Sequence, residues 1–527
     1  MKQSFLRKVT GGILLLLAGL TQAVTAQQAQ SDSLIISSDT VYADGVHVKK
    51  LIINGTSGNP MDTIDISLRN NSKIEAITVE SGKAKIHFTG EENVTYTLGS
   101  ITITKDAELA LSGSPQKLSI QSVGNEGRFT DETGVVQKVE GTHSFEIEQA
   151  GGHSIKGTLS IYSKVGKYTS DMGPLCTLQK RENNSWIDDP GNKDMSAETI
   201  NLGIAEGGIY RLKWVDPDED NHAQTVLHSK AINLLQIDGQ ADLKDVTYDA
   251  IALNTGTLDT TKVSMDNVTA LPCTTGENSA GFSVGALSNL ELTLKGTNSS
   301  LGILRNHGTM TLRNENNATF ENTTIYNEGI FTDETGKEGK ILGLAGLWVK
   351  GITPNADITA PDGTQMKSVS LQYAIKSFYK KVIVETYQEG QWVNYDEIKG
   401  GESENVNPEL KSTQGDDTEK WTLSSSHTFT TAIKGTYRFR IETTKDQCKT
   451  IWYSKPYELI ASEFEINDGQ TTIGEENSTT ILPSLLITAG KEGEEAIEAT
   501  LENIEIAEHA VGTPSVNVES NAKVNLT

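Results

Sequence analysis

The chain has 527 residues and a formal net charge of −25, from 45 Lys and Arg against 70 Asp and Glu. Such an acidic chain lacks the basic footprint of proteins that bind nucleic acids or anionic membranes, which excludes both as partners. Its three cysteines, Cys176, Cys273 and Cys448, are too few and too far apart for a disulfide framework or a zinc site.

The first 26 residues have the parts of a secretory signal peptide. Basic residues (Lys2, Arg7 and Lys8) precede an apolar run over residues 11–20, and Val24-Thr25-Ala26 fits the small-x-small cleavage rule. The run is shorter than the roughly 20 residues that span a bilayer, and we expect no transmembrane segment after it. We predict cleavage near Ala26 and export to the cell surface or the extracellular space, with the periplasm as the alternative.

Residues 27–141 are expected to form a first β-solenoid segment, with short strands and tight turns between them. Ile101 and Ile103, and after a turn Leu109 and Leu111, alternate with polar residues, which is the period of a half-buried strand. Asn and Gly interrupt the apolar runs, as tight turns require. No sustained helical periodicity follows the signal peptide, so we expect an all-β protein.

Residues 142–235 predict an antiparallel sandwich. Leu175, Cys176 and Leu178 lie in one expected strand, and Gly208-Ile209-Tyr210 enters a later one. A Gly-x-Tyr at that place resembles the tyrosine corner of immunoglobulin-like and fibronectin type III domains. The disulfide of antibody domains has no counterpart, which removes only that subtype.

Both kinds of segment, the solenoid and the sandwich, recur along the chain. The segments 125–134 and 327–336 match at nine of ten positions, and Tyr437-Arg438 repeats Tyr210-Arg211. Internal repeats of this kind define the architecture before any other pattern does. We therefore expect a second solenoid segment over residues 236–343.

The same alignment predicts a second sandwich over residues 344–462. Residues 463–527 align with the start of the second solenoid segment and stop in mid-strand. We expect a third, incomplete solenoid segment there, and a chain that is a fragment of a longer repeat protein.

The turns of the solenoid segments have a regular spacing. Asn306-His307-Gly308 and Asn327-Glu328-Gly329 lie 21 residues apart, which suits one coil, and Leu290, Leu292 and Leu294 alternate with polar residues. The pattern resembles bacterial right-handed parallel β-helix proteins, a group that includes adhesins, carbohydrate-binding solenoids and polysaccharide lyases. The predicted fold class is all-β, with short parallel β-helix segments alternating with antiparallel β-sandwich domains.

Two tryptophans occupy equivalent places in the two sandwiches. Trp186 and Trp392 each follow a polar turn. An exposed indole can stack on a sugar ring, and it can equally pack on the sandwich. Both residues are the candidate carbohydrate-binding residues.

Three alternate aspartates, Asp216, Asp218 and Asp220, resemble the start of a calcium loop. The sixth and twelfth positions of that loop, which need Gly and Glu, hold Asn221 and Leu227. A hairpin turn is the competing interpretation. Calcium at these three aspartates is the one cofactor the sequence leaves open.

Catalytic patterns are weak. Gly281-Phe282-Ser283-Val284-Gly285 fits G-x-S-x-G but lies among strands, not between a strand and a helix. The repeated acids of Asp131-Glu132 and Asp333-Glu334 are expected to form the same turn twice. Lys295, Arg305 and Arg313 are candidate basic partners for a lyase, without an acidic cluster near them in sequence.

We therefore expect an exported, non-catalytic binding protein, with carbohydrate as the ligand that the β-helix resemblance implies. One alternative is a structural stalk or adhesin with host or bacterial surface proteins as partners. A second alternative is a β-helix polysaccharide lyase or glycoside hydrolase.

Overall fold

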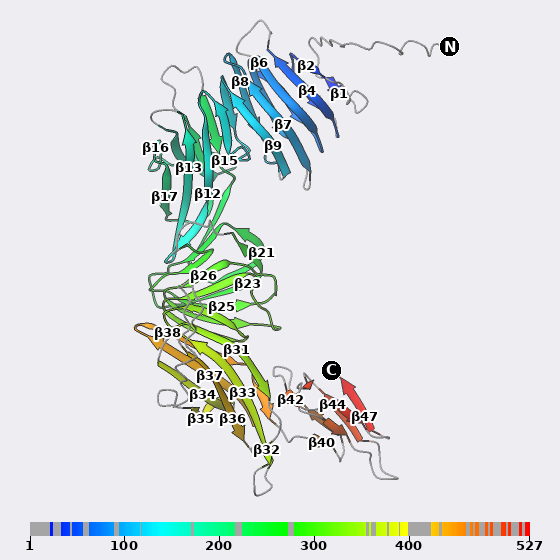
Figure 1. Ribbon diagram of the computed structural model, residues 1–527, viewed down its shortest axis with the longest axis vertical. Coiled ribbons are helices and arrows are strands. Elements are labelled where there is room, and N and C mark those ends of the chain that lie inside the picture. Colours follow the sequence, from blue (N-terminus) through cyan, green and yellow to red (C-terminus); the bar gives the residue numbers. More distant parts are fainter. Residues whose placement is uncertain are drawn as a thin grey trace, which may run out of the picture.

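The computed structural model shows an all-β protein whose segments up to residue 459 follow one another along its long axis (Figure 1). The structure describes residues 22–24, 33–42, 45–55, 63–88, 94–115, 117–169, 173–216, 224–271, 279–354, 358–359, 365–376, 379–388, 390–398, 423–431, 435–459 and short strands between 464 and 526. Nearly all of the predicted signal peptide, Cys273, Asp218 and Asp220 lie outside these ranges. In the described part, no helix is long and apolar enough to cross a membrane.

The first parallel segment (residues 22–131) consists of two ladders of parallel strands. One ladder joins β2 (Leu34–Ile36), β4 (His47–Asn54), β6 (Lys73–Phe88), β7 (Thr95–Ile103) and β9 (Lys117–Asn125). The other joins β1 (Gln22–Val24), β3 (Thr40–Tyr42), β5 (Thr63–Leu68), the end of β6, β8 (Ala107–Ser112) and β10 (Arg128–Asp131). The register stacks inward apolar residues in columns, such as Ile53, Val79 and Ile103, which are all fully buried.

The first antiparallel segment (residues 138–237) contains two groups of strands around one core. The first group is β11 (Lys138–Gly141), β12 (Phe145–Ile155), β13 (Thr158–Tyr168) and β17 (Thr199–Ile204). The second is β14 (Leu175–Glu182), β15 (Ser185–Asp188), β16 (Met195–Ser196), β18 (Gly208–Val215), β19 (Gln224–His228) and β20 (Ile232–Ile237). Ile161, Leu178 and Trp214 pack in the shared core. The Tyr210 hydroxyl donates to the carbonyl oxygen of Glu206, four residues earlier in the chain, at 2.9 Å.

The second parallel segment (residues 241–343) repeats the plan of the first. One ladder runs from β20 through β22 (Ala250–Leu253), β24 (Phe282–Val284), β26 (Gly302–Asn306) and β28 (Thr323–Asn327) to β30 (Gly339–Gly343). The other contains β21 (Ala241–Tyr248), β23 (Thr260–Ala270), β25 (Asn289–Leu294), β27 (Thr309–Asn314) and β29 (Ile330–Gly336). Leu290, Leu292 and Leu294 are buried while their neighbours are half-buried, as the alternation predicted.

The second antiparallel segment (residues 347–459) again has two groups of strands. One holds β31 (Leu347–Pro354), β32 (Ile358–Thr359), β33 (Gln365–Ile375) and β36 (Leu423–Thr431). The other holds β34 (Tyr379–Gln388), β35 (Gln391–Ile398), β37 (Gly435–Lys445), β38 (Cys448–Ser454) and β39 (Tyr457–Leu459).

The third parallel segment (residues 464–526) shows three short ladders. They are β40 (Phe464–Ile466), β43 (Leu485–Ile487) and β46 (Val516–Val518); β41 (Gln470–Ile473), β44 (Ile497–Leu501) and β47 (Ala522–Leu526); and β42 (Thr480–Leu482) with β45 (Ile504–Ile506).

Two junctions join the parallel segments to the antiparallel segments that follow them. At the first junction, β10 pairs in parallel with β19, and at the second, β29 pairs in parallel with β38. A buried asparagine supports each: Asn125 Nδ2 donates to Thr225 Oγ1 at 3.0 Å, and Asn327 Nδ2 donates to Thr450 Oγ1 at 2.9 Å. The hydrogen-bonded ladder therefore continues through each junction.

Candidate functional site: the cavity at the second junction

The two predicted tryptophans lie on equivalent hairpins, Trp186 on β15 and Trp392 on β35. A guanidinium group covers each ring, that of Arg211 at 4.5 Å from the Trp186 centroid and that of Arg438 at 4.3 Å from the Trp392 centroid. Cation–π contacts of this kind stabilise the pair and occupy one face of the indole. Both rings are half-buried, so each has less free surface for a sugar than the sequence suggested.

Side chains on the neighbouring strands hold both guanidinium groups in place. Arg211 Nε donates to Gln179 Oε1 at 2.6 Å, and Arg438 Nε donates to Glu385 Oε2 at 2.7 Å. The second copy has more contacts, because Arg438 also lies 4.2 Å from the ring centroid of Tyr453. The stacks therefore order the two hairpins, which is a structural contribution.

The predicted calcium site is described only at Asp216. This side chain is buried, and its Oδ2 lies 2.7 Å from His143 Nδ1. Asp218 and Asp220 lie outside the described residues. Within the described ranges, no three His, Cys, Asp or Glu side chains are grouped to hold a metal ion.

Ser283 of the G-x-S-x-G pattern is fully buried, and its hydroxyl accepts the backbone N–H of Gly157 at 2.8 Å. The hydroxyl thus binds the tip of the β12–β13 hairpin to the second parallel segment. Cys176 and Cys448 are likewise buried free thiols.

The three candidate basic residues all form ion pairs. Arg305 contacts Glu328 at 3.1 Å, Arg313 contacts Glu334 at 2.7 Å, and Lys295 contacts Asp242 at 3.3 Å. Each acid lies 21 or more residues away in the chain, which explains why no acidic cluster was visible in sequence. Arg305 and Arg313 each pair with an acid one coil further along.

A cavity of about 190 Å³ lies at the second junction, where sequence patterns gave no site. Its wall continues an inward column of the second parallel segment, in which Val263, Leu292, Leu312, Asp333 and Trp452 stand side by side on successive strands. Asp333 is thus a carboxylate in the place of a core leucine.

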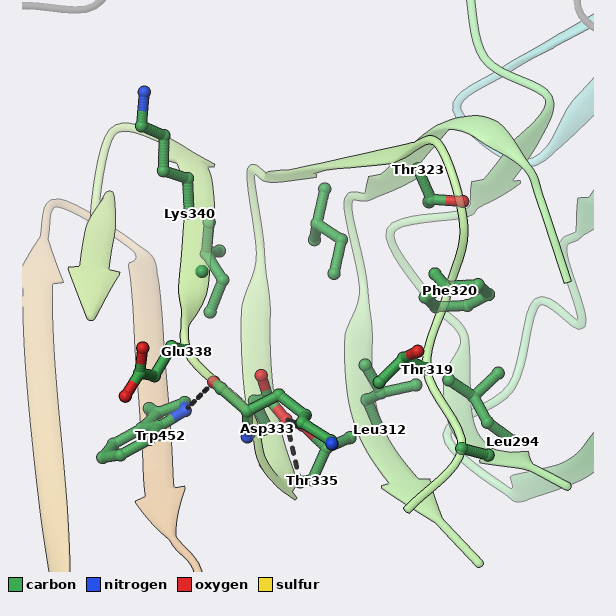
Figure 2. Close-up of a pocket in the computed structure, with 15 residues that line it drawn as sticks. Leu294, Leu312, Thr319, Phe320, Thr323, Asp333, Thr335, Glu338, Lys340 and Trp452 are labelled. Atoms are coloured by element: carbon green, nitrogen blue, oxygen red, sulfur yellow. Dashed lines mark hydrogen bonds between the residues drawn. The ribbon is translucent and has the colours of Figure 1, made fainter. Parts of the chain in front are cut away.

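Figure 2 shows how the cavity is bounded. Trp452, Glu338 and Asp333 stand on one side, with Leu312, Leu294 and Phe320 on the other. Trp452 is fixed by its Nε1–H, which donates to the carbonyl oxygen of Lys337 at 2.9 Å. Glu338 and Lys340 are exposed lining residues, so the cavity reaches the protein surface.

The first junction has the same aspartate but a different environment. Asp131 follows Leu111 in the inward column, and Leu227 stands where the second junction has Trp452. The buried Val136 follows five residues later, and its backbone N–H donates to Asp131 Oδ2 at 3.0 Å. At the aligned position of the second junction stands Glu338, whose carboxylate instead accepts the backbone N–H of Ile352 at 3.3 Å.

Burial raises the pKa of both aspartates, and hydrogen bonds from the following threonine oppose it. Burial, with a smaller contribution from the adjacent charge of Glu334, raises the pKa of Asp333 to about 6. At Asp131, backbone N–H groups of Val135 and Val136 also lower the pKa. The two junctions therefore share a turn. They differ at the Oδ2 atom of the aspartate, which accepts the Val136 backbone N–H at the first junction, whereas the aligned residue of the second junction, Glu338, forms a different contact.

One signal in the sequence could have indicated this site. The repeat is nearly identical up to Gly134 and Gly336 and then diverges, with Val135-Val136 in one copy and Lys337-Glu338 in the other. A change from two apolar to two charged residues at a core position predicts that the two cores differ there.

No protein-family model matches this sequence, and no curated protein is significantly similar to it. Among solved structures, the chain is similar to the alpha chain of the chicken interferon gamma receptor, at 5% sequence identity and a TM-score of 0.15. The likeness covers 59% of this chain and 97% of that chain. So low a TM-score defines no shared fold.

Proposed function

We propose that this chain is an exported, non-catalytic binding protein whose ligand is a carbohydrate, and that the cavity at the second junction is its binding site. We also propose that the parallel segments are short β-helices and the antiparallel segments sandwich domains, divided near residues 141, 235, 343 and 462. Export rests on the basic and apolar N-terminus, and N-terminal sequencing of the secreted chain tests it.

The observation that carries the binding proposal is the contrast between the two junctions. One sequence repeat folds twice, but Trp452 and Glu338 stand at the second junction where the first has Leu227 and Val136, and the cavity at the second junction has aromatic, hydroxyl and carboxylate groups on its wall. In another protein, a cavity of about 150 Å³ holds a benzene ring, so about 190 Å³ admits a single six-membered ring with substituents. Aromatic faces beside hydrogen-bonding groups suit the mixed apolar and polar faces of a sugar.

The test is binding of the mature chain to a panel of plant, host and microbial glycans. The informative variant carries two substitutions, Lys337→Val and Glu338→Val, which copy Val135 and Val136 of the first junction. We call this variant the Val–Val graft. Its control is Glu315→Val, which removes an exposed negative charge outside the cavity. We expect glycan binding by the wild type and the control and its loss in the graft.

Two other results would contradict the proposal. Loss of binding in Trp186→Ala or Trp392→Ala, with the graft unaffected, would place the carbohydrate site on the two hairpins. Absence of binding to every glycan would remove the ligand class.

The stalk alternative has its own supporting observation. The ladders that continue from β10 to β19 and from β29 to β38 make each junction stiff, as a protein that displays a distant surface requires. Binding to surface proteins, with none to glycans, would favour this function.

A further inference from the structure

The Asp333 carboxylate is only half satisfied by the protein. Its Oδ1 accepts the backbone N–H of Thr335 at 2.9 Å and the Thr335 hydroxyl at 2.7 Å. Its Oδ2 has no hydrogen-bond donor among the described residues, although the side chain is only 7% exposed. Oδ2 is not among the fully buried atoms that lack a partner, so it can be reached from the cavity that Asp333 lines, and a ligand that brings a hydrogen-bond donor can bind it.

No cation of the described residues forms an ion pair with Asp333. Lys340 lines the cavity, but its ammonium lies over the Trp348 ring at 4.5 Å and points away from Asp333 (Figure 2). The nearest acids, Glu334 and Glu338, add negative charge to the same region. The cavity is therefore small, mainly apolar in its lining, and bordered by two acids (Asp333 and Glu338) and two lysines (Lys337 and Lys340), of which neither lysine pairs with Asp333.

We propose, building on carbohydrate binding at this cavity, that the ligand is an amino sugar with a free, protonated amine that contacts Asp333 Oδ2. The sugar ring lies against Phe320, the half-buried aromatic residue of the lining, and the ammonium group supplies a donor and a positive charge to an oxygen that no lysine of the lining pairs with.

The amine distinguishes this ligand from its closest relatives. A hydroxyl at the same position donates one neutral hydrogen bond, whereas an ammonium makes a charge-assisted bond, which is roughly twice as strong. An N-acetyl group keeps an N–H donor but removes the charge and adds bulk in a cavity of about 190 Å³. Affinity should therefore fall when the amine is acetylated or replaced by a hydroxyl.

The experiment is isothermal titration calorimetry of the full mature chain with glucosamine, N-acetylglucosamine and glucose at pH 7.5. We expect glucosamine to bind about tenfold more tightly than the other two sugars, the ratio expected for one charged hydrogen bond in place of a neutral one. Asp333→Asn keeps an oxygen for Thr335 and removes the charge, so this preference should disappear. Asp131→Asn, the same change at the first junction, where the Val136 backbone N–H occupies the carboxylate, should leave it intact.

A pH titration of the wild type gives a second measurement that does not depend on how the variant folds. Of the ionisable groups around the cavity (Asp333, Glu338, Lys337 and Lys340), only the Asp333 carboxyl is buried. Its protonation below about pH 6 removes the charge that holds the ammonium, so the preference for glucosamine should fall towards one.

The outcomes separate the two proposals. If all three sugars bind equally and the Val–Val graft abolishes that binding, the carbohydrate site stands and the amino-sugar inference is wrong. If glucosamine keeps its preference in Asp333→Asn or at pH 5, the amine lies elsewhere and the inference is again wrong. If no sugar binds, both proposals fail.

Discussion

His228 gives the clearest stability prediction, because its ring is buried next to two positive charges. It ends β19, and its Nδ1 lies 2.7 Å from the carbonyl oxygen of Asp131, which can only accept, so Nδ1 carries the proton. Burial, together with the charges of Arg211 and Lys213, lowers the pKa of His228 from its ordinary 6.5 to about 4. The unfolded chain therefore binds a proton between these two pH values that the folded chain does not.

The sign and the size of the effect follow from that difference. Stability should rise with pH between about 4 and 6.5, because protonation favours the unfolded state there. The difference in pKa corresponds to about 3 kcal/mol of unfolding free energy at and below pH 4. His228→Gln removes the titration and retains a donor for the Asp131 carbonyl.

Urea unfolding of the wild type and His228→Gln, followed by circular dichroism from pH 4 to 8, measures the effect. The wild type should lose about 3 kcal/mol relative to the variant as the pH falls from 7 to 4, with no change between pH 7 and 8. The other ionisable groups are common to both chains and cancel in the difference. A difference that stays constant over the whole range would refute the argument.

Three further changes test other contacts. Glu385→Gln should destabilise the second antiparallel segment by about 3 kcal/mol, measured by calorimetry, because Arg438 and Arg440 both lose the buried carboxylate that they share. Gly343→Ala should lower the melting temperature sharply, since φ is +115° and a Cβ would lie 2.0 Å from the carbonyl oxygen of Asn327. Asn327→Ala should cost about 2 kcal/mol or more, because buried partners at the second junction lose their hydrogen bonds, and hydrogen exchange in β38 should then accelerate. Unchanged unfolding in any of these variants would mean that its contact does not contribute.

The alternation of buried and exposed residues along a strand, and the residues that form turns, could be predicted from the sequence because both depend on residues close together in the chain. Leu290, Leu292 and Leu294 show their alternation in one short run, and Tyr210 lies only four residues from the carbonyl that its hydroxyl contacts. These features depend on local geometry, so a single sequence is enough to predict them.

The site was not predictable in the same way, because it depends on register between distant strands. Asp333 and Trp452 are neighbours only because β29 pairs with β38. The role of Glu338 is visible only by comparison with Val136, which occupies the aligned position of the first junction and donates its backbone N–H to Asp131. The ring contacts of Trp186 and Trp392 also depend on register, since each arginine lies on another strand. Sequence placed both indoles on hairpins but could not show what covers them.

The strand pairing that crosses each junction determines how the protein would respond to a force that pulls its two ends apart. Strands such as β12 and β13 run roughly along the long axis, while β23 and β25 lie across it (Figure 1). A force that pulls the two ends apart would therefore act along the strands of the antiparallel segments and shear their hydrogen bonds together. In the parallel segments the same force would act across the strands and separate neighbouring strands one pair at a time. At the first junction the pull falls on the paired residues of β10 and β19 together, from Arg128 opposite Gln224 to Asp131 opposite Leu227. Mechanical failure should begin within a parallel segment, and the hairpins that hold Trp186 and Trp392 should remain folded when it does.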